Sequence, residues 1–209
     1  MATVGQIRVL CVDDHPLVLD GIVRKLGRER DIKVVATAGT GEVAVDLFRR
    51  LRPDLVLMDL KLPKMSGLEA IEEIRQEDHE ARIVVLTMYE GDEDIYRALR
   101  AGASSYLLKD TLSSDLVTIV REVFAGGRPL PGRVASLLAV RVNQSSLSPR
   151  EIEVLKLVGK GMRNKEIACE LHLGQDTVQT HIRRLFAKLG VKDRTSAVTV
   201  ALNRGIIHL

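Results

Sequence analysis

Polar side chains follow four short apolar segments in the first half of this 209-residue chain. The segments lack the alternation of a half-exposed strand, so they are typical of a parallel sheet that is buried on both faces. The residues that follow them are Asp13 and Asp14, Asp59, Thr87, and Lys109. Because the carboxyl ends of parallel strands meet at one edge of a sheet, the sequence predicts that these side chains gather at one site.

The first half of the chain alternates between strand and helix patterns. We expect strands at Ile7–Val12, Ile32–Ala38, Leu55–Met58, Ile83–Leu86 and Ser105–Leu108. Helical periods lie between and after them, at Pro16–Arg28, Glu42–Leu51, Gly67–Gln76, Glu93–Ala101 and Ser113–Ala125. Five such units predict an α/β domain with a doubly wound, five-stranded parallel sheet of the flavodoxin-like type.

The last third of the chain is wholly helical in pattern. Ser148, Pro149 and Glu151 supply an N-cap, a proline in the first turn and a capping box for one helix. The other expected boundaries are Asn164 as the cap of a second helix, Gln175 and Gly190 as the limits of a third, and Arg194–Asn203 as a fourth. Two short helices joined by the tight turn LHLG are typical of a helix-turn-helix, so we expect an all-α four-helix domain of this kind.

The chain therefore divides into a domain at residues 1–126, a linker at 127–146 and a domain at 147–209. A short helix is expected in the linker from Pro131 onward. Its apolar side chains, Val134, Leu137, Leu138 and Val142, need either a domain interface or a dimer contact to cover them. In the last helix, Val198 and Leu202 form one apolar stripe, which could either pair in a dimer or pack in the core of the domain.

Charge and composition narrow the function further. Residues 1–126 carry 17 Lys and Arg against 22 Asp and Glu, whereas residues 147–209 carry 11 against 6, so the C-terminal domain is the candidate partner of a polyanion. Cys11 and Cys169 are the two cysteines, and their positions favour reduced thiols over a disulfide or zinc site. The chain has no long apolar segment and no signal-peptide layout, so we expect a soluble, cytoplasmic protein that does not associate with membranes.

The polar residues at the strand ends suit phosphoryl chemistry. Mg²⁺ prefers one or two carboxylates together with water and phosphate oxygens, and Asp13, Asp14 and Asp59 can supply that shell. Lys109 would bring a compact positive charge to the phosphoryl oxygens, and Thr87 could donate its hydroxyl to one of them.

Residues 1–126 resemble a response-regulator receiver domain, through VDDHP, LVLMDLKLPKMSGLEA, VVLTMYE and AGASSYLLKD. The resemblance implies that Asp59 is phosphorylated and that Asp13, Asp14, Asp59 and the Lys61 backbone carbonyl bind Mg²⁺. It also implies that Lys109 contacts the phosphoryl group and that Thr87 and Tyr106 form a switch pair, with Tyr106 turning inward when Thr87 moves.

Two details near this site are specific to the chain. Many receivers have proline after the lysine, and here Asp110 leaves the geometry of the Lys109–Asp110 peptide open. His15 follows the acidic pair and precedes a helix that begins with Pro16, so we expect it to pack or to cap that helix rather than to bind a metal.

The expected recognition helix offers two groups of DNA-contacting residues. Gln179, Thr180 and Arg183 lie opposite its buried stripe and are candidates for base contacts in the major groove. The phosphate-contacting candidates are Arg184, Lys188, Lys165 and Lys192.

Residues 147–209 resemble the LuxR-type helix-turn-helix, so the whole chain is similar to response regulators of the NarL/FixJ type. Gly174 stands where that family often has a Ser or Thr cap, and Gln179 stands where a lysine is frequent. We therefore expect a DNA target site that cannot be read from better-known relatives. DNA binding should also depend less on salt than it would with a lysine at position 179.

These features predict a two-component response regulator that is phosphorylated on Asp59 by a sensor histidine kinase. It would then bind double-stranded promoter half-sites as a homodimer and act on RNA polymerase. We expect no enzyme activity beyond its own phosphoryl transfer and dephosphorylation. The alternative is a phosphorylation-independent regulator whose receiver is a dimerisation scaffold. A phosphohydrolase that uses Asp59 as its nucleophile is disfavoured. Such enzymes typically have a second acidic residue two positions later, and here that position is Lys61.

Overall fold

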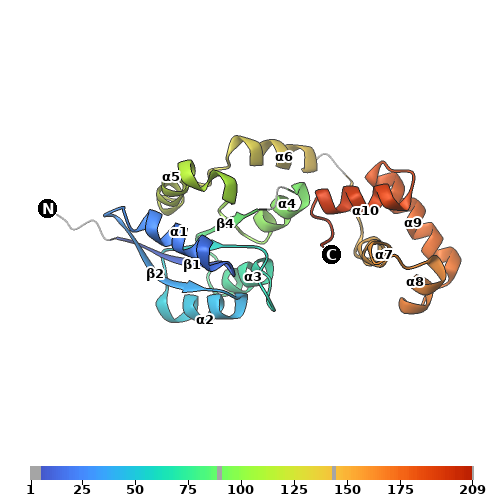
Figure 1. Cartoon of the computed structure of the whole chain (residues 1–209), viewed down its shortest axis with the longest axis horizontal. Helices are drawn as coiled ribbons and strands as arrows, with labels where there is room; N and C mark the ends of the chain where they lie inside the picture. Colours follow the sequence, from blue (N-terminus) through green and yellow to red (C-terminus); the bar gives the residue numbers. More distant parts are fainter. Residues whose placement is uncertain (1–5, 89–90, 143–144, 209) are drawn as a thin grey trace. The chain divides into compact units, whose positions relative to one another are not determined.

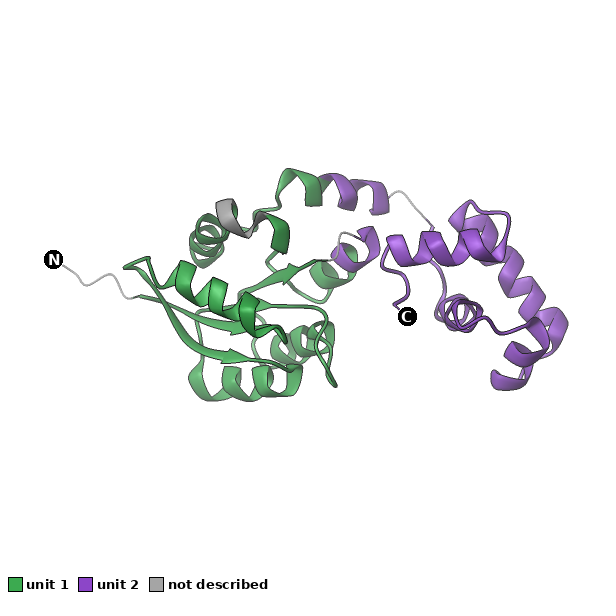
Figure 2. Ribbon diagram, viewed as in Figure 1, with its two compact units in different colours: residues 1–88, 96–135 green, residues 89–95, 136–209 purple. Residues whose placement is uncertain are grey.

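The computed structural model describes residues 6–88, 91–142 and 145–208, apart from the side chains of 111–114. Figure 2 shows its two compact units, residues 1–88 with 96–135 and residues 89–95 with 136–209. The divisions fall between residues 88 and 89, 95 and 96, and 135 and 136. None of the described helices is long and apolar enough to span a membrane.

The first unit contains a five-stranded parallel sheet in the order β2-β1-β3-β4-β5 (Figure 1). Its strands are β1 (Ile7–Val12), β2 (Ile32–Ala38), β3 (Leu55–Met58), β4 (Ile83–Thr87) and β5 (Ser105–Leu108). The predicted fold class is confirmed. One boundary differs, because Thr87 is the last residue of β4 rather than the first residue beyond it.

Five α-helices follow the strands in turn. They are α1 (Pro16–Leu26), α2 (Gly41–Leu51), α3 (Gly67–Glu77), α4 (Asp92–Arg100) and α5 (Leu112–Phe124), the last preceded by a 3-10 turn at Lys109–Thr111. Local sequence explains several of the helix starts. The Thr40 hydroxyl accepts from the Val43 amide at 3.3 Å to cap α2, and Ser66 with Glu69 forms a capping box for α3.

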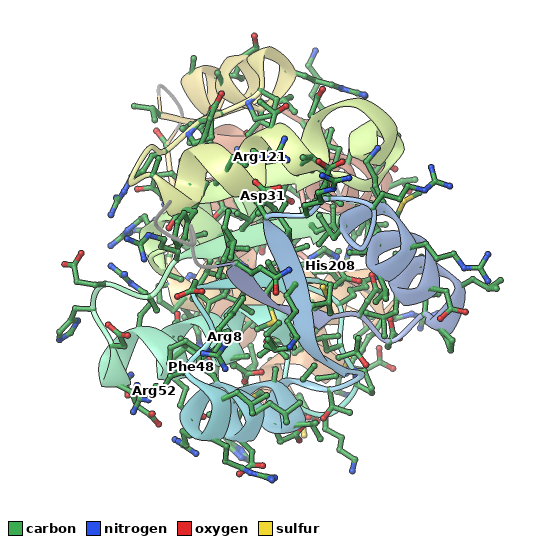
Figure 3. All side chains as sticks on the ribbon, turned by 90° about the vertical axis from the view of Figure 1, so that its left-hand side faces the viewer. Arg8, Asp31, Phe48, Arg52, Arg121 and His208 are labelled. Carbon is green, nitrogen blue, oxygen red and sulfur yellow. The ribbon has the colours of Figure 1, made fainter. Side chains whose placement is uncertain are left out.

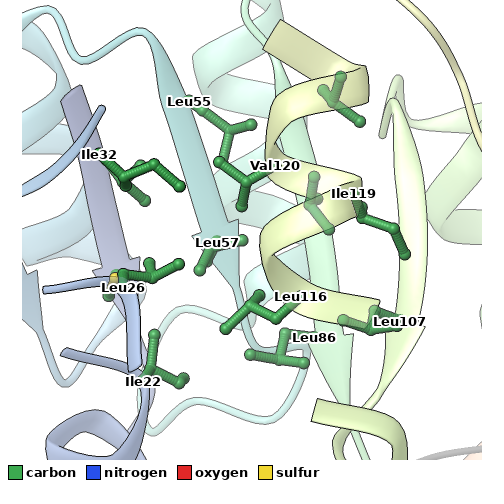
Figure 4. Close-up of a cluster of buried hydrophobic side chains, with 14 of the residues drawn as sticks. Ile22, Leu26, Ile32, Leu55, Leu57, Leu86, Leu107, Leu116, Ile119 and Val120 are labelled. Atoms are coloured by element: carbon green, nitrogen blue, oxygen red, sulfur yellow. The ribbon is translucent and has the colours of Figure 1, made fainter. Parts of the chain in front are cut away.

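The main hydrophobic cluster of this unit lies on the sheet face that α1 and α5 cover (Figure 4). Strand residues such as Leu57 and Leu86 pack there against Leu26 and Leu116, all of them nearly or fully buried. Helices α2 and α3 cover the opposite face (Figure 1). Both faces are therefore buried, which explains why the strands carry apolar runs instead of alternating polar residues.

Polar contacts tie the outer parts of this unit to its sheet (Figure 3). Arg8 of β1 donates to the Arg52 carbonyl at 2.8 Å, and the Arg52 guanidinium lies 5.5 Å from the centre of the Phe48 ring. On α5, the exposed Arg121 pairs with Asp31 at 2.8 Å and with Glu29 at 2.6 Å. Exposed pairs of this kind add little stability, so the apolar cluster carries most of it.

The chain continues as helices α6 (Gly132–Val142), α7 (Pro149–Gly159), α8 (Asn164–Glu170), α9 (Gln175–Leu189) and α10 (Arg194–Asn203). The capping box of Ser148 and Glu151 is confirmed. Gly174 caps α9 without a side-chain hydrogen bond and Gly190 ends it at φ 68°, also as expected. In α6, Val134 is buried whereas Val142 is 65% exposed.

Asn164 does not cap α8, so that prediction is wrong. The N-cap is Arg163, whose backbone amide donates to Glu166 at 2.6 Å, and Asn164 is the first helical residue. The Asn164 side chain instead accepts from Arg194 of α10 at 3.3 Å. A longer-range contact has thus replaced the local capping that the sequence favours.

One hydrophobic cluster holds α7 to α10 together. Its fully buried members include Leu155, Ile167, Val178 and Leu185, and the partly buried Val198 packs against it. Leu202 is 39% exposed. Core packing therefore accounts for Val198, while Leu202 remains available for a dimer contact.

Candidate functional site

Four of the five polar residues predicted at the strand ends lie close together at one edge of the sheet. They are Asp13, Asp14, Asp59 and Lys109. Val12 is in register with Met58, so Asp13 and Asp59 extend adjacent strands side by side. Backbone bonds fix both, since the Asp13 amide donates to Ala38 at 3.0 Å and the Asp59 amide donates to Val12 at 2.9 Å. Rigid sheet geometry therefore positions both carboxylates.

Lys109, which follows β5, joins these two carboxylates. Its ammonium lies 2.6 Å from Asp13 Oδ2 and 2.7 Å from Asp59 Oδ2, and all three side chains are at most 5% exposed. Burial alone would lower the pKa of Lys109, but the hydrogen bonds to Asp13 and Asp59 outweigh it and raise the pKa above its ordinary value. The lysine is thus a fixed positive charge at the site.

The carboxylates outnumber the ammonium. Asp13, Asp14, His15 and Asp59 each offer one ligand atom, and these atoms all lie within 4.8 Å of one another. Oxygen donors in excess of the local positive charge suit a divalent cation such as Mg²⁺. Lys61 is exposed, and its backbone amide lies 3.4 Å from Asp59 Oδ1, so its main chain is close to the cluster.

His15 caps α1 through its backbone carbonyl, which accepts from the Leu19 amide at 3.1 Å, and not through its side chain. It occupies the N-cap position of α1 without a side-chain capping bond, and its side chain is 67% exposed. Its Nδ1 lies 2.7 Å from Asp14 Oδ1 and 3.2 Å from Asp13 Oδ1. The only sequence signal for this contact was its place directly after the acidic pair.

The expected switch pair lies on one face of the sheet. Tyr106 is in register with Val85, and Thr87 follows Val85 by two residues on β4, so side-chain alternation directs Tyr106 and Thr87 to the same side. That side is opposite the cluster containing Leu86 and Leu107. Both side chains are fully buried, so the ring of Tyr106 is directed inward in this structure.

The backbone at the start of α3 lies directly against the backbone of Asp59, the candidate phosphoacceptor. A Cβ added to Gly67 would lie 1.8 Å from the Asp59 carbonyl oxygen, so no side chain fits at the start of α3. The sequence did not point to Gly67, because a close contact between two backbone segments produces no recognisable pattern of residues. On the other side of the site, the Lys109–Asp110 peptide is trans, and Asp110 pairs with Arg133 at 3.2 Å.

The helix-turn-helix unit exposes most of the residues that we expected to contact DNA. On α9 these are Gln179, Thr180, Arg183 and Arg184, and beyond α9 they are Lys165 of α8 and Lys192. The Thr180 hydroxyl donates to the Asp176 carbonyl at 2.9 Å, one turn back along the helix. The methyl group of Thr180 is thus the part suited to a base contact.

Lys188 is placed differently from the other basic residues. Its ammonium lies 2.7 Å from Glu151, a residue 2% exposed that also caps α7. Burial would raise the pKa of Glu151, but hydrogen bonds from Lys188 and Ser148 outweigh it, and the pKa lies below its usual value. Lys188 therefore joins α9 to α7, and its charge is already paired.

Comparisons with known proteins agree with this architecture. Residues 9–121 match the family model of the response regulator receiver domain. Residues 145–201 match that of the bacterial regulatory proteins of the luxR family.

Individual relatives extend over nearly the whole chain. The response regulator protein VraR of Staphylococcus epidermidis is 38% identical over 207 residues, covering 97% of this chain and 99% of VraR. RcsB from Salmonella enterica serovar Typhimurium, bound to promoter P1flhDC in the presence of phosphomimetic BeF3-, has a TM-score of 0.74 and 26% identity, covering 96% of this chain and 100% of that one. A structure of two RcsB dimers bound to two parallel DNAs has a TM-score of 0.71 and 26% identity, with coverage of 95% and 99%.

Proposed function

Because the chain belongs to the response regulators that join a receiver domain to a LuxR-type helix-turn-helix, we propose that phosphorylation of Asp59 controls its binding to DNA. The observation that carries this proposal is the buried contact of Lys109 with both Asp13 and Asp59. It places a nucleophilic carboxylate, a fixed positive charge and further oxygen ligands within one site.

Asp59 is the phosphoacceptor in this proposal. It lies at the end of β3, held by its backbone bond to Val12, so its carboxylate is oriented before a phosphoryl donor arrives. A sensor histidine kinase or a small acyl phosphate supplies the phosphoryl group. Lys109, now bonded to Asp59, then contacts a phosphoryl oxygen and offsets its charge.

Receiver domains in general bind Mg²⁺, and the acidic cluster of this chain fits such an ion. Asp13, Asp14, Asp59 and the Lys61 carbonyl would hold it. When bound, the cation neutralises negative charge on the incoming phosphate and on Asp59. The excess of carboxylates over the Lys109 ammonium supports this assignment.

Thr87 and Tyr106 transmit the change. Thr87 ends β4 at the same sheet edge as Asp59, and Tyr106 shares its face of the sheet. A phosphoryl group accepts a hydrogen bond from the Thr87 hydroxyl, which alters the packing available to the Tyr106 ring. Phosphorylation can shift the equilibrium between two conformations of the receiver only by the difference between its interaction free energies with them.

DNA is the proposed target of the exposed face of α9. Gln179, Thr180 and Arg183 would contact base edges, and Arg184, Lys165 and Lys192 would contact phosphates. Two copies would bind paired half-sites, as the dimers of the RcsB structure suggest by similarity. RNA polymerase is the further partner that this arrangement would serve.

The test is intact mass combined with sedimentation, with and without Mg²⁺ and acetyl phosphate. We expect wild type to gain about 80 Da, the mass of one phosphoryl group in transfer of this kind, and to dimerise. Asp59→Asn should do neither. Asp46→Asn, which removes an exposed carboxylate from α2, is the matched control and should behave as wild type.

Equal oligomerisation and DNA binding by wild type and Asp59→Asn, with phosphoryl donor supplied, would contradict the proposal. That result would favour the alternative regulator, in which the receiver is a dimerisation scaffold. A mass gain in Asp59→Asn would instead show that another residue accepts the phosphoryl group.

A further inference from the structure

His15 adds a nitrogen donor to a cluster whose other donors are oxygens. Its ring Nδ1 lies 2.7 Å from Asp14 Oδ1 and 3.2 Å from Asp13 Oδ1. In an octahedral shell with metal–ligand distances of about 2.1 Å, neighbouring ligand atoms lie about 3.0 Å apart. The two measured distances lie on either side of that value, so the ring nitrogen and both carboxylates can be neighbours around one cation.

The His15 ring contacts Asp13 and Asp14 and takes no part in capping the helix that follows. The side chain is 67% exposed and makes no capping bond to α1. The backbone amide of His15, rather than its ring, donates to Asp13 Oδ1 at 3.0 Å and thereby orients that carboxylate. To bind the cation, the ring would exchange its contacts with Asp13 and Asp14 for a coordination bond, and no capping bond would be lost.

We propose that His15 is a ligand to the divalent cation of this receiver and makes the site selective for cations that accept imidazole. This inference rests on the metal site of the proposed function. Imidazole nitrogen binds Co²⁺, Ni²⁺ and Zn²⁺ more strongly than it binds Mg²⁺, which prefers oxygen ligands and retains its waters. The site would thus bind Co²⁺ more tightly, relative to Mg²⁺, than its carboxylates alone would allow.

Calorimetric titration of the full chain with Co²⁺ and with Mg²⁺ tests the selectivity. We expect His15→Ala to lower the ratio of Co²⁺ to Mg²⁺ affinity about 10-fold or more. Loss of a residue that only hydrogen-bonds to a metal ligand already lowers metal affinity about 10-fold, and loss of a ligand should cost at least as much. Mg²⁺ affinity should stay near that of wild type. His79→Ala removes another exposed histidine of the same domain and is the matched control, which should leave both affinities unchanged.

Electron spin echo measurements on bound Mn²⁺ separate a ligand from a hydrogen-bonded neighbour. A coordinated ring nitrogen gives a ¹⁴N coupling, which we expect in wild type and in His79→Ala and which should be absent in His15→Ala. Asp13→Asn should weaken binding of all three cations, which would locate them at this cluster.

The outcomes distinguish this inference from the metal site on which it rests. Mg²⁺ binding with an unchanged affinity ratio in His15→Ala, and no nitrogen coupling in wild type, would overturn the role of His15 alone. Failure of wild type to bind any of the cations would overturn both.

Discussion

Each half of the molecule pairs a lysine with buried acidic side chains, but the two sites differ in their balance of charge. In the receiver unit, one ammonium, Lys109, faces two buried carboxylates, Asp13 and Asp59. In the helix-turn-helix unit, Lys188 faces the single carboxylate of Glu151. The first site is negative overall and the second is neutral.

This difference separates the proposed phosphorylation site from an ion pair that serves the fold. Glu151 also accepts from the Ser148 amide at 2.7 Å, so its capping role and its ion pair satisfy it within the fold. Around Lys109, by contrast, two buried carboxylates share one ammonium. A buried charge without a full partner is costly, so its presence at a rigid sheet edge indicates a site for an external cation.

Removal of Lys109 should have the largest effect on stability. Lys109→Met leaves two buried carboxylates without a counter-charge, and we expect a loss of about 3–5 kcal/mol in the free energy of unfolding of the receiver. Urea unfolding measures this loss, with Lys33→Met, which replaces an exposed lysine of β2, as control. Added Mg²⁺ should restore part of the loss. A loss no greater than in the control would show that the buried pair contributes nothing.

Glu151→Gln should have a smaller effect, confined to the helix-turn-helix unit. Glutamine keeps an oxygen that can accept from Ser148 but loses the charge opposite Lys188. We expect a loss of about 1.5–3 kcal/mol, near the lower end because Lys188 is 32% exposed and water can solvate it. Hydrogen exchange of amides in α7 and α9 of the full chain reports this local stability. Faster exchange in the receiver strands would contradict a local effect.

Acid should weaken the same unit through the same residue. The pKa of Glu151 is lowered in the folded protein, so the unfolded state binds the proton more readily. The stabilisation is therefore present above the ordinary glutamate range, about 4.3, and is lost as pH falls through the lower folded value. The protection factors of amides in α7, which are corrected for the intrinsic pH dependence of exchange, should fall over that interval in wild type. Glu151→Gln should show a flatter profile, and identical profiles would exclude Glu151 as the source.

Asp13→Asn should affect stability in the opposite direction from Lys109→Met. It removes one of two carboxylates that face a single ammonium, while its amide oxygen still accepts from the His15 amide. We expect the receiver to be unchanged or stabilised by about 0–1 kcal/mol, although cation binding is weakened. A large loss in urea unfolding would mean that the site is balanced without a cation, and the comparison of the two units would fail.

Arg121→Met should have the smallest effect. Arg121 also faces two carboxylates, Asp31 and Glu29, but it is 45% exposed. Because water and salt screen such a group, we expect the urea midpoint to match wild type at moderate ionic strength. A shift as large as that of Lys109→Met would show that the number of carboxylates matters more than their burial.

Sequence patterns predicted much of the fold because local rules govern it. Apolar runs located all five strands, and glycines and capping residues located most helix ends, as Ser148 and Gly190 illustrate. Asn164 failed because the side chain of Arg194, 30 residues away, engages it. Such a partner leaves no periodic signal in the sequence.

The candidate site was accessible from sequence because strand ends converge in a parallel sheet. The grouping of Asp13, Asp59 and Lys109 follows from topology alone. The partner of Lys188 did not follow, because Glu151 lies 37 positions away on a different helix. The direction of the His15 ring was equally inaccessible, since neither propensity nor periodicity specifies a rotamer.

The fit of Gly67 against the Asp59 carbonyl also bears on genetics. A residue with no functional group would be expected to tolerate replacement in a saturation library. At this position, however, even alanine would collide with the main chain of Asp59, the proposed phosphoacceptor. A selection for signalling should therefore return glycine alone at position 67. Alleles that change it would mimic loss of Asp59 while leaving every charged group of the site in place.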